Sequence, residues 1–559
     1  MGNTLQASIC ELAEAEPGAR ALAFYSADRS WEWISRGELS ASAERAAGHL
    51  AELGLGEGSV CVQVPYNDRF AVDVLLGSLV LGALPLLVAP PAIQGTNSSL
   101  PEILDNIIGR TSAPVVVAAD SVADLRDELT AKHESTRFVF GPGELADAPA
   151  APWTMRDPGD LAALQLTSGT TGFPRICMWR QQNVMAALDG MAKAMAVTTD
   201  DVYLNWTPLY HDMGLMNNIM LCLTRGIPLV MMSPFDFVKR PALWLHGMQD
   251  TGATITWSPN FGFALAAQRI RDRELEGVDL EHVAGFWNAA ERIHHETIVA
   301  FKERFSPYGL RPDAIKTNFG CAENVGGATF TPPGEQVPIE HIDPAVMHER
   351  QVAVPVTDEA ASLPVVGCGK AHPGITIHIL DDEGNDLPEG HIGALALDTA
   401  SRMEGYMYDP EATAAAFHNG LLKTGDLGYL RDGEYFWTGR VQERIAIRGR
   451  KIDPSDFEAP LLAVSDLRAG SFAAFGQDDP GLGTQRIIVI AEAREERSQP
   501  VGDIKASVKQ AVVDGLGVGV DEVVLVAQGT LTKTSSGKRR HRHFAEMYRL
   551  GQLAEFEVA

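Results

Sequence analysis

The chain has little cysteine, and its cysteines form no pattern that indicates disulfides or a zinc site. The six cysteines are scattered over 559 residues without CxxC pairs, and no histidines stand near them at zinc-ligand spacing. Buried, reduced thiols are therefore expected, as in a protein of a reducing compartment. The N-terminus also lacks the basic start and apolar core of a secretory signal, so a cytoplasmic protein is expected.

Long apolar runs and an excess of basic residues are missing as well. The most apolar stretch, Val74 to Pro90, is interrupted by Gly77, Gly82 and Pro85, which predicts a buried helix, turn and strand rather than a membrane span. The 46 Lys and Arg residues against 73 Asp and Glu residues give a formal net charge of −27. This surplus repels polyanions, which argues against nucleic acid or an anionic membrane as the main partner.

Short β-branched runs alternate with helical stretches through most of the chain, as in VCVQVP, PVVVAAD, IPLVMMS and TITWSP. Apolar strands separated by helices predict an α/β fold with parallel sheets covered by helices. A β-rich stretch at about 365–440 predicts a small antiparallel subdomain, because turn residues separate its strands. A chain of 559 residues is longer than a single hydrophobic core supports, so more than one domain is expected. We expect an N-terminal domain at 1–440 and a smaller α+β C-terminal domain at 441–559.

A loop of small hydroxyl residues and glycines follows an apolar strand in LQLTSGTTGFPR, residues 164–175. Glycines allow close backbone approach, so successive N–H groups can converge on an anion, and Ser and Thr add hydroxyl donors. A nucleotide phosphate is the natural ligand, although small polar loops without a ligand are common. The segment is not the GxxxxGK[ST] phosphate loop, because the lysine is missing and the spacing differs.

Two acidic residues are candidates for contacts with the rest of a nucleotide. In TNFGCAEN, residues 317–324, an aromatic residue and a glycine at a strand end suit adenine stacking, and Glu323 can hold Mg²⁺ against phosphate oxygens. In LLKTGDLGYL, residues 421–430, Asp426 is expected at the carboxyl end of a strand, where it can accept hydrogen bonds from ribose hydroxyls. The alternative for each is an ordinary strand-end or turn acid.

Two basic segments lie near the C-terminus, GRVQERIAIRGRKIDPSDFE at 439–458 and LTKTSSGKRRHRH at 531–543. Lys538 in the second stands beside a glycine, so it can reach into a site built by another domain. There it can neutralise charge that develops on a phosphate and a carboxylate oxygen. A nucleic-acid patch or a solvated surface is the alternative, and the net charge of −27 argues against nucleic acid.

In this order and spacing, the five motifs resemble those of the acyl-adenylate-forming superfamily, which includes acyl-CoA synthetases, luciferases and peptide-synthetase adenylation domains. A closer resemblance is to the fatty acyl-AMP ligases. It is carried by NWTPLYHDMGL at 205–215, SPFDFVKRPALWL at 233–245, WSPNFGFALAAQR at 257–269 and IRGRKIDPSDFE at 447–458. A long segment at about 331–364 stands where that subgroup has its characteristic insertion.

The resemblance implies a role for each matching residue. Lys538 would bridge the acyl carboxylate and the α-phosphate, Glu323 would bind Mg²⁺, and Asp426 and Arg440 would hold the ribose. The other residues implied for the ATP site are Thr167, Ser168, Gly169, Thr170, Thr171, Gly172, Ala289, Ala290, Glu291, Asn318, Phe319, Gly320, Cys321 and Ala322. An apolar pocket for the acyl group would include His211, Met213, Gly214 and Trp257, with His211 at the mouth of the phosphopantetheine channel. The alternative for His211 is a turn histidine beside Asp212, and for aromatic residues such as Trp257 it is the core.

The implied activity is ATP- and Mg²⁺-dependent conversion of a fatty or bulky apolar carboxylic acid to acyl-AMP, with transfer to a phosphopantetheine thiol. An acyl-CoA synthetase that uses CoA, and an enzyme that hands acyl-AMP to a partner, are alternatives to a carrier-protein ligase. A homologue that binds nucleotide or acyl groups without turnover is a further alternative. The resemblance also implies a mobile C-terminal lid that rotates about Gln442, where relatives usually have Asp or Lys.

Overall fold

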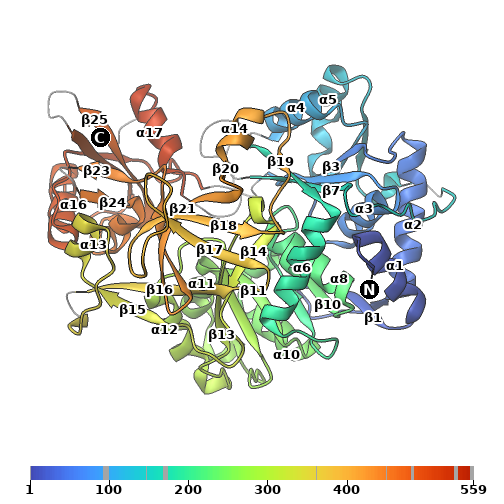
Figure 1. Cartoon of the computed structure of the whole chain (residues 1–559), viewed down its shortest axis with the longest axis horizontal. Coiled ribbons are helices and arrows are strands. Elements are labelled where there is room, and N and C mark those ends of the chain that lie inside the picture. The colour runs from blue at the N-terminus through green and yellow to red at the C-terminus, as the bar shows by residue number, and fades with distance from the viewer. Residues whose placement is uncertain are drawn as a thin grey trace.

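The computed structural model describes residues 2–91, 100–145, 148–167, 174–359, 362–447, 450–479, 484–533 and 539–553. These residues form an α/β fold with a large N-terminal part, built of two sheets and their helices, and a smaller C-terminal part with its own sheet. Figure 1 shows the C-terminal part, in red, at the opposite end of the molecule from the N-terminus. The predicted fold class is confirmed by this arrangement.

The first sheet has seven strands in the order β19-β8-β7-β4-β3-β5-β6. They are β3 (Val60–Val64), β4 (Leu84–Leu87), β5 (Val115–Ala118), β6 (Arg137–Phe140), β7 (Leu161–Leu166), β8 (Ile176–Arg180) and β19 (Gly405–Tyr406). Strands β3 to β7 pair in parallel, whereas β8 pairs antiparallel with both β7 and β19. The helix, turn and strand predicted for Val74 to Pro90 are confirmed as α3 (Arg69–Val80) and β4.

The second sheet follows the order β17-β18-β21-β22-β16-β14-β13-β12-β11-β9-β10-β1-β2. Its parallel part comprises β1 (Arg20–Tyr25), β9 (Tyr203–Asn205), β10 (Leu229–Met232), β11 (Ile255–Pro259), β12 (Gly285–Ala289) and β13 (Ile315–Cys321), with β2 (Trp33–Ser35) antiparallel at the edge. Its antiparallel part comprises β14 (Gly326–Phe330), β16 (Leu363–Ala371), β17 (Ile375–Leu380), β18 (Gly393–Thr399), β21 (Leu421–Arg431) and β22 (Glu434–Arg440). The antiparallel strands expected at about 365–440 are thus joined through β14 and β13 to the parallel strands, and they extend the large sheet instead of forming a separate one.

Helices cover both sheets, and in the core of the second sheet the aromatic side chains of three of its helices, Trp244, Phe263 and Phe301, pack together. The main helices are α1 (Leu5–Ala15), α2 (Arg36–Glu52), α3, α4 (Leu100–Thr111), α5 (Arg126–Lys132), α6 (Gln181–Met195), α10 (Ala242–Thr251), α11 (Asn260–Arg269) and α12 (His295–Phe305). Helix α6 contacts β7 and β8 of the first sheet and β14 of the second, so it lies between the two sheets. No helix in the described part of the chain has both the length and the apolar composition that a bilayer crossing needs.

The C-terminal part has a small core of its own, which begins at Ile445. Its elements are β23 (Ile445–Ile447), β24 (Arg450–Ile452), α15 (Glu458–Leu462), β25 (Leu467–Asp479), β26 (Thr484–Ala493), α16 (Val501–Leu516), β27 (Glu522–Val526) and α17 (His541–Arg549). Within the segment at 331–364, α13 (Pro344–Arg350) contacts β24 of this part, as Figure 1 shows at the left. The boundary at 440/441 stays a prediction.

A buried carboxyl on β22 makes the stability of this sheet depend on pH. The side chain of Glu434 is 5% exposed, and its Oε1 accepts a hydrogen bond from the Gly369 N–H at 2.6 Å. Burial raises the pKa of Glu434 from its ordinary value to about 7. Because the folded protein holds this proton more tightly than the unfolded chain, the stabilisation is complete below about pH 4.5 and is lost as the pH rises through the folded pKa.

We therefore expect Glu434→Gln to stabilise the protein above neutral pH, because the amide needs no deprotonation and still offers an oxygen to Gly369. The expected gain reaches up to about 3 kcal/mol near pH 8 and vanishes near pH 4.5. Thermal unfolding of both proteins over this pH range measures it. A difference in melting temperature that does not change with pH would contradict this origin of the effect.

Candidate active site

Several of the predicted nucleotide residues follow neighbouring strands of the second sheet. Strands β11, β12 and β13 pair in parallel, so their carboxyl ends lie at one edge. The loop with Glu291 follows β12 and the turn with Glu323 follows β13, while the segment with His211 follows β9, which pairs with β11. Ligands of open α/β sheets bind outside the carboxyl ends of the strands, so this edge is the candidate active site.

The predicted phosphate loop joins β7 to β8. The Thr167 N–H donates to the Arg175 carbonyl at 2.9 Å, which closes the base of the loop as a continuation of the β7–β8 hairpin. Ser168, Gly169, Thr170, Thr171 and Gly172 lie outside the described residues, so their contacts with ATP stay predictions. The amide of Gln165 on β7 donates to the Tyr210 carbonyl at 2.9 Å, and this hydrogen bond ties the loop to the segment that carries His211.

Glu323 stands in a single helical turn directly after β13. Its backbone carbonyl accepts from the Met403 N–H at 2.7 Å, and the Trp179 indole donates to the Ala322 carbonyl at 2.8 Å. The Tyr406 hydroxyl donates to Glu323 Oε1 at 2.7 Å, so the side chain is held as a hydrogen-bond acceptor. A half-buried carboxylate fixed in this way is suited to contact a cation.

The potential metal ligands around Glu323 are few, as in a site where the cation binds together with the nucleotide. Among the described residues, no group of three or more His, Cys, Asp or Glu side chains is placed to hold a metal ion. Mg²⁺ in nucleotide sites is bound by one or two carboxylates and completed by water and substrate phosphates. Glu323 therefore fits Mg²⁺ bound together with ATP.

The predicted adenine side is formed by the loop after β12 and by β13. Ala290 has a φ of 71°, an unusual value for a residue with a Cβ, and it turns the chain at the strand end. Glu291 Oε1 accepts from the Phe261 N–H at 2.7 Å, and burial raises the pKa of this carboxyl. The Phe319 ring is half-buried and meets Tyr435 edge-on, with 5.2 Å between centroids. The loop after β12 thus has a fixed backbone beside β13, while contacts with adenine stay predictions.

The other predicted residues on β13 are part of the sheet. The Asn318 amide is buried and donates to the Thr329 and Phe319 carbonyls. Gly320 lies so close to β14 that a Cβ there would stand 2.6 Å from the Gly326 carbonyl oxygen, which explains why the position has no side chain. Cys321 is within electrostatic range of both Glu323 and Asp426, and burial raises the pKa of its thiol.

Asp426 is buried in the middle of β21 rather than at a strand end, contrary to expectation. The strand continues to Arg431 because β21 pairs with β22 along its length, with a bulge after Leu427. Arg440 is its cross-strand partner, with its Nε 3.3 Å from Asp426 Oδ1, and the Trp437 indole donates to the same oxygen at 3.0 Å. The charge of Asp426 raises the pKa of the Arg440 guanidinium. Asp426 and Arg440 are thus brought together, as expected for a shared role.

The predicted acyl-pocket residues are largely buried. His211 Nδ1 lies 2.7 Å from Asp212 Oδ1 and 3.1 Å from the Met213 N–H, in the arrangement of a turn histidine. Gly214 packs so tightly that a Cβ would stand 2.1 Å from the Pro208 carbonyl oxygen. Trp257 is fully buried and stacks on Trp287 with 5.2 Å between centroids. This environment is that of a packed core, so roles for His211, Met213, Gly214 and Trp257 in acyl binding stay predictions.

Charged contacts join the C-terminal part to the loop after β12. Arg292 Nη1 lies 3.0 Å from Asp456 Oδ1, and His294 Nε2 lies 3.0 Å from Glu458 Oε2. Glu458 also accepts from Arg539 Nη1 at 3.0 Å. Burial alone would raise the pKa of Glu458, but the His294 hydrogen bond and the Arg539 charge hold that pKa below its ordinary range. The C-terminal part therefore docks beside the predicted adenine loop.

Lys538 itself lies outside the described residues, but the chain on both sides of it is described. Lys533 and Arg539 form an antiparallel bridge, and Arg539 contacts Glu458, which also contacts His294. Lys533 is also within electrostatic range of Glu291. The segment that carries the predicted catalytic lysine thus starts and ends near the candidate active site.

The predicted hinge also has a contact with the end of the chain. Gln442 accepts a hydrogen bond from Arg542 of α17. Burial, reinforced by Asp453, raises the pKa of the adjacent Glu443 to about 7. Gln442 is thereby linked to the helix that follows Lys538, and its role as a hinge stays a prediction.

Two residues of the site were missed by sequence reasoning, Tyr406 and Trp437. Tyr406 belongs to GYMYDP, about eighty residues after Glu323, and only the pairing of β19 with β8 brings it to that carboxylate. Trp437 lies in β22, within the run EYFW. Its indole N–H donates a hydrogen bond to Asp426 because β21 and β22 are neighbouring strands. Neither residue has a local pattern that predicts such a contact.

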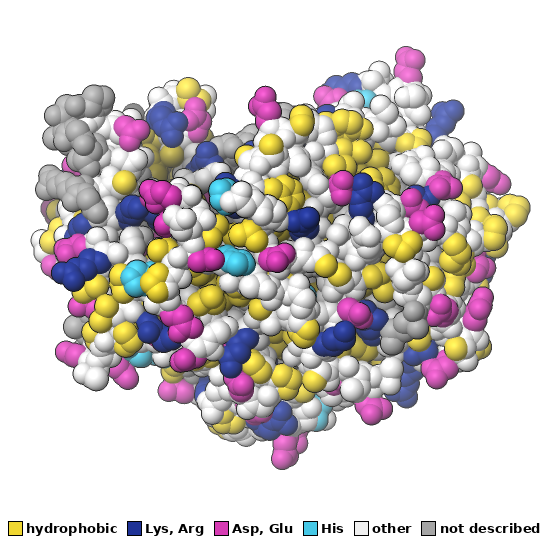
Figure 2. All heavy atoms as spheres, viewed as in Figure 1, with side chains coloured by type: hydrophobic (Ala, Val, Ile, Leu, Met, Phe, Trp, Pro, Cys, Tyr) yellow, Lys and Arg dark blue, Asp and Glu magenta, His cyan; other side chains and the backbone are white. Residues whose placement is uncertain are grey.

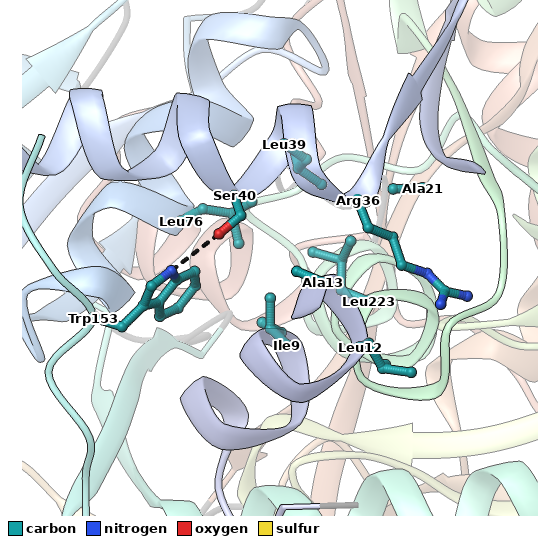
Figure 3. A pocket seen from close by; sticks show the side chains of 10 residues that line it. All are labelled: Ile9, Leu12, Ala13, Ala21, Arg36, Leu39, Ser40, Leu76, Trp153 and Leu223. Atoms are coloured by element: carbon teal, nitrogen blue, oxygen red, sulfur yellow. Dashed lines mark hydrogen bonds between the residues drawn. The ribbon is translucent and has the colours of Figure 1, made fainter. Parts of the chain in front are cut away.

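A small cavity between α1 and α2, lined by aliphatic side chains and by Trp153, contains none of the predicted residues (Figure 3). The Trp153 indole donates to Ser40 Oγ at 3.1 Å there, which satisfies its polar atom. On the face shown in Figure 2, acidic and basic side chains are interspersed, without a broad basic patch for nucleic acid.

Known proteins resemble this chain over nearly its whole length. A putative fatty-acid–CoA ligase of Mycobacterium tuberculosis is 27% identical over 100% of this chain and 99% of the relative. A medium-chain-fatty-acid–[acyl-carrier-protein] ligase of Moorena producens is 27% identical over 87% of this chain and 85% of the relative. A solved structure from work on fatty acyl-adenylate ligases of E. coli and L. pneumophila has a TM-score of 0.90 and 25% identity, covering 98% of each chain.

A protein family also matches most of the chain. Residues 11–407, which contain the phosphate loop, Glu291, Glu323 and the β19 strand, match the family described as AMP-binding enzyme. The site found at the sheet edge lies within this matched region, except for Asp426, Arg440 and the C-terminal part. The chain belongs to the family of AMP-binding enzymes.

Proposed function

We propose that this enzyme activates a fatty or other apolar carboxylic acid as its acyl-AMP, with release of pyrophosphate from ATP. The observation that carries the proposal is the Glu323 carboxylate, which Tyr406 holds beside β8, the strand that follows the predicted phosphate loop. The names of the relatives, which are fatty-acid ligases, support a fatty acid as the substrate class.

In the proposed reaction, a carboxylate oxygen of the acid attacks the α-phosphorus of ATP, and pyrophosphate leaves. The enzyme forms no covalent bond with either substrate, so positioning and charge neutralisation carry the catalysis. Mg²⁺ held at Glu323 would supply positive charge against the phosphate oxygens. Asp426 with Arg440 orients the ribose, and Lys538 offsets the repulsion between the acid and the α-phosphate.

The acceptor of the acyl group is proposed to be a phosphopantetheine thiol. A carrier-protein ligase among the relatives and the long segment at 331–364 favour a carrier protein, whereas a putative CoA ligase among them favours CoA. A rotation of residues 441–559 about Gln442 would withdraw Lys538 after adenylation and admit the thiol. A cytoplasmic location, inferred from the reduced cysteines, belongs to the same proposal.

A panel of carboxylic acids with ATP and Mg²⁺ tests the substrate and the acceptor together. Acyl-AMP is scored by mass spectrometry without acceptor, and thioester is scored separately with CoA and with a phosphopantetheinylated carrier protein. We expect acyl-AMP from medium or long apolar acids and thioester with the carrier protein. Thioester with CoA alone would transfer the assignment to an acyl-CoA synthetase, and ATP binding without acyl-AMP from any acid would leave a non-catalytic homologue.

A further inference from the structure

Tyr406 connects three parts of the candidate active site. It forms strand β19 with Gly405, and its backbone pairs with Cys177 on β8, the strand that follows the phosphate loop. The residue is 8% exposed, and its hydroxyl donates to Glu323 Oε1 at 2.7 Å. A tyrosine hydroxyl keeps its proton at neutral pH, so Tyr406 is the donor of this bond and the Glu323 carboxylate is the acceptor.

The ring of Tyr406 is fixed from its other side as well. The Arg175 guanidinium lies over the ring, with its carbon 5.2 Å from the centroid. Arg175 Nε is 3.6 Å from Asp409 Oδ2, and Asp409 caps α14 (Pro410–Ala415) by accepting from the Ala412 N–H. The Tyr406 N–H donates to Thr413 Oγ1 of the same helix at 2.8 Å. Ring and hydroxyl therefore have one defined position between Arg175 and Glu323.

We propose that Tyr406 is a positioning residue that holds the Glu323 carboxylate for the divalent cation bound with ATP. Its hydrogen bond engages Oε1 and would leave Oε2 for the cation, so the carboxylate loses less rotational freedom when the cation binds. Hydrogen bonds to a ligating carboxylate from the next layer of residues raise metal affinity about 10- to 100-fold. The proposal rests on the proposed function, because it takes Glu323 as the cation ligand.

The alternative is that Tyr406 only fills space. A buried phenol that only fills space could be replaced by Phe without effect on any ligand, since Phe keeps the ring beneath Arg175. The chain offers a matched comparison in Tyr429, which is fully buried on β21 and whose hydroxyl donates to Glu340 Oε2 at 2.9 Å. Tyr429→Phe removes the same kind of hydrogen bond at a carboxylate that has no proposed ligand.

The test measures binding of Mn²⁺, as a probe for Mg²⁺, by electron paramagnetic resonance in the presence of α,β-methylene-ATP. We expect Tyr406→Phe to weaken Mn²⁺ binding about tenfold, and affinity for the analogue without divalent cation to stay within about twofold of wild type. The Mg²⁺ concentration for half-maximal pyrophosphate exchange should rise by the same factor. Tyr429→Phe should match wild type in all three measurements.

Wild-type Mn²⁺ affinity in Tyr406→Phe would overturn the proposal. An equal loss of analogue binding with and without the cation would also overturn it, because that result indicates a structural role for the hydroxyl.

The variant Glu323→Gln tests separately whether Glu323 is the cation ligand, as the proposed function requires. If that variant binds Mn²⁺ as well as wild type does, Glu323 is not the cation ligand, and the Tyr406 proposal falls with it. Loss of Mn²⁺ binding in Glu323→Gln with none in Tyr406→Phe overturns the Tyr406 proposal alone.

Discussion

Replacing Lys538 by alanine is expected to lower acid-dependent ATP–pyrophosphate exchange about a thousandfold, with ATP affinity within about threefold of wild type. The reason is that the lysine is proposed to act on charge that develops only as the carboxylate approaches the α-phosphate. Ground-state binding of ATP is proposed to depend instead on the predicted phosphate loop, Glu323 and Asp426. Exchange is followed with labelled pyrophosphate, and ATP affinity is measured by calorimetry.

A control from the same domain separates this effect from a general loss of positive charge. Lys509 on α16 donates to the Asp521 carbonyl at 2.8 Å and is remote from the predicted site residues in sequence. Lys509→Ala should exchange pyrophosphate as wild type does. Full exchange in Lys538→Ala would contradict the proposed role, and so would a parallel loss of ATP binding.

Replacing Asp426 by alanine is expected to raise the Kd for ATP about a hundredfold. The side chain is 2% exposed and is paired with Arg440 and Trp437, so its removal leaves a partly buried cation and an indole N–H without this partner. Hydrogen bonds to a charged group contribute about 1.5–3 kcal/mol each. The loss of two such bonds, from the ribose hydroxyls of ATP to the Asp426 carboxylate, accounts for the expected rise in Kd. Calorimetric titration with ATP measures the change.

The same variant gives a more specific test with 2′,3′-dideoxy-ATP. Wild type should bind ATP much more tightly than this analogue, whereas Asp426→Ala should bind the two equally, because the acceptor for the ribose hydroxyls is gone. The control variant is Glu434→Gln, because Glu434 is another buried carboxyl of the same sheet. It should keep the wild-type preference for ATP over the dideoxy analogue. Retained discrimination in Asp426→Ala would show that Asp426 supports only the sheet.

Local sequence patterns predicted the individual elements of the N-terminal part well. Apolar β-branched runs became β3, β5, β10 and β11, and the interrupted run from Val74 became a helix and a strand. The predicted phosphate loop falls between β7 and β8, as an apolar strand followed by glycines predicts. These features depend on interactions between residues close in sequence, which periodicity and turn residues describe directly.

Contacts between distant strands were beyond such patterns. Asp426 was expected at a strand end because Gly425 precedes it, but pairing with β22 carries the strand through to Arg431. Tyr406 reaches Glu323 only because a two-residue strand adds to the edge of the first sheet at β8. The joining of antiparallel and parallel strands through β13 and β14 likewise has no local sequence signal.

The bond that the acid forms can be identified with a substrate whose carboxylate carries ¹⁸O in both positions. The enzyme is incubated with this acid, ATP, Mg²⁺ and the thiol acceptor, and the products are analysed by mass spectrometry. Attack on the α-phosphorus predicts AMP that carries one ¹⁸O atom, together with unlabelled pyrophosphate. Formation of ADP with ¹⁸O in inorganic phosphate would contradict acyl-adenylate formation, because it would place the attack on the γ-phosphorus.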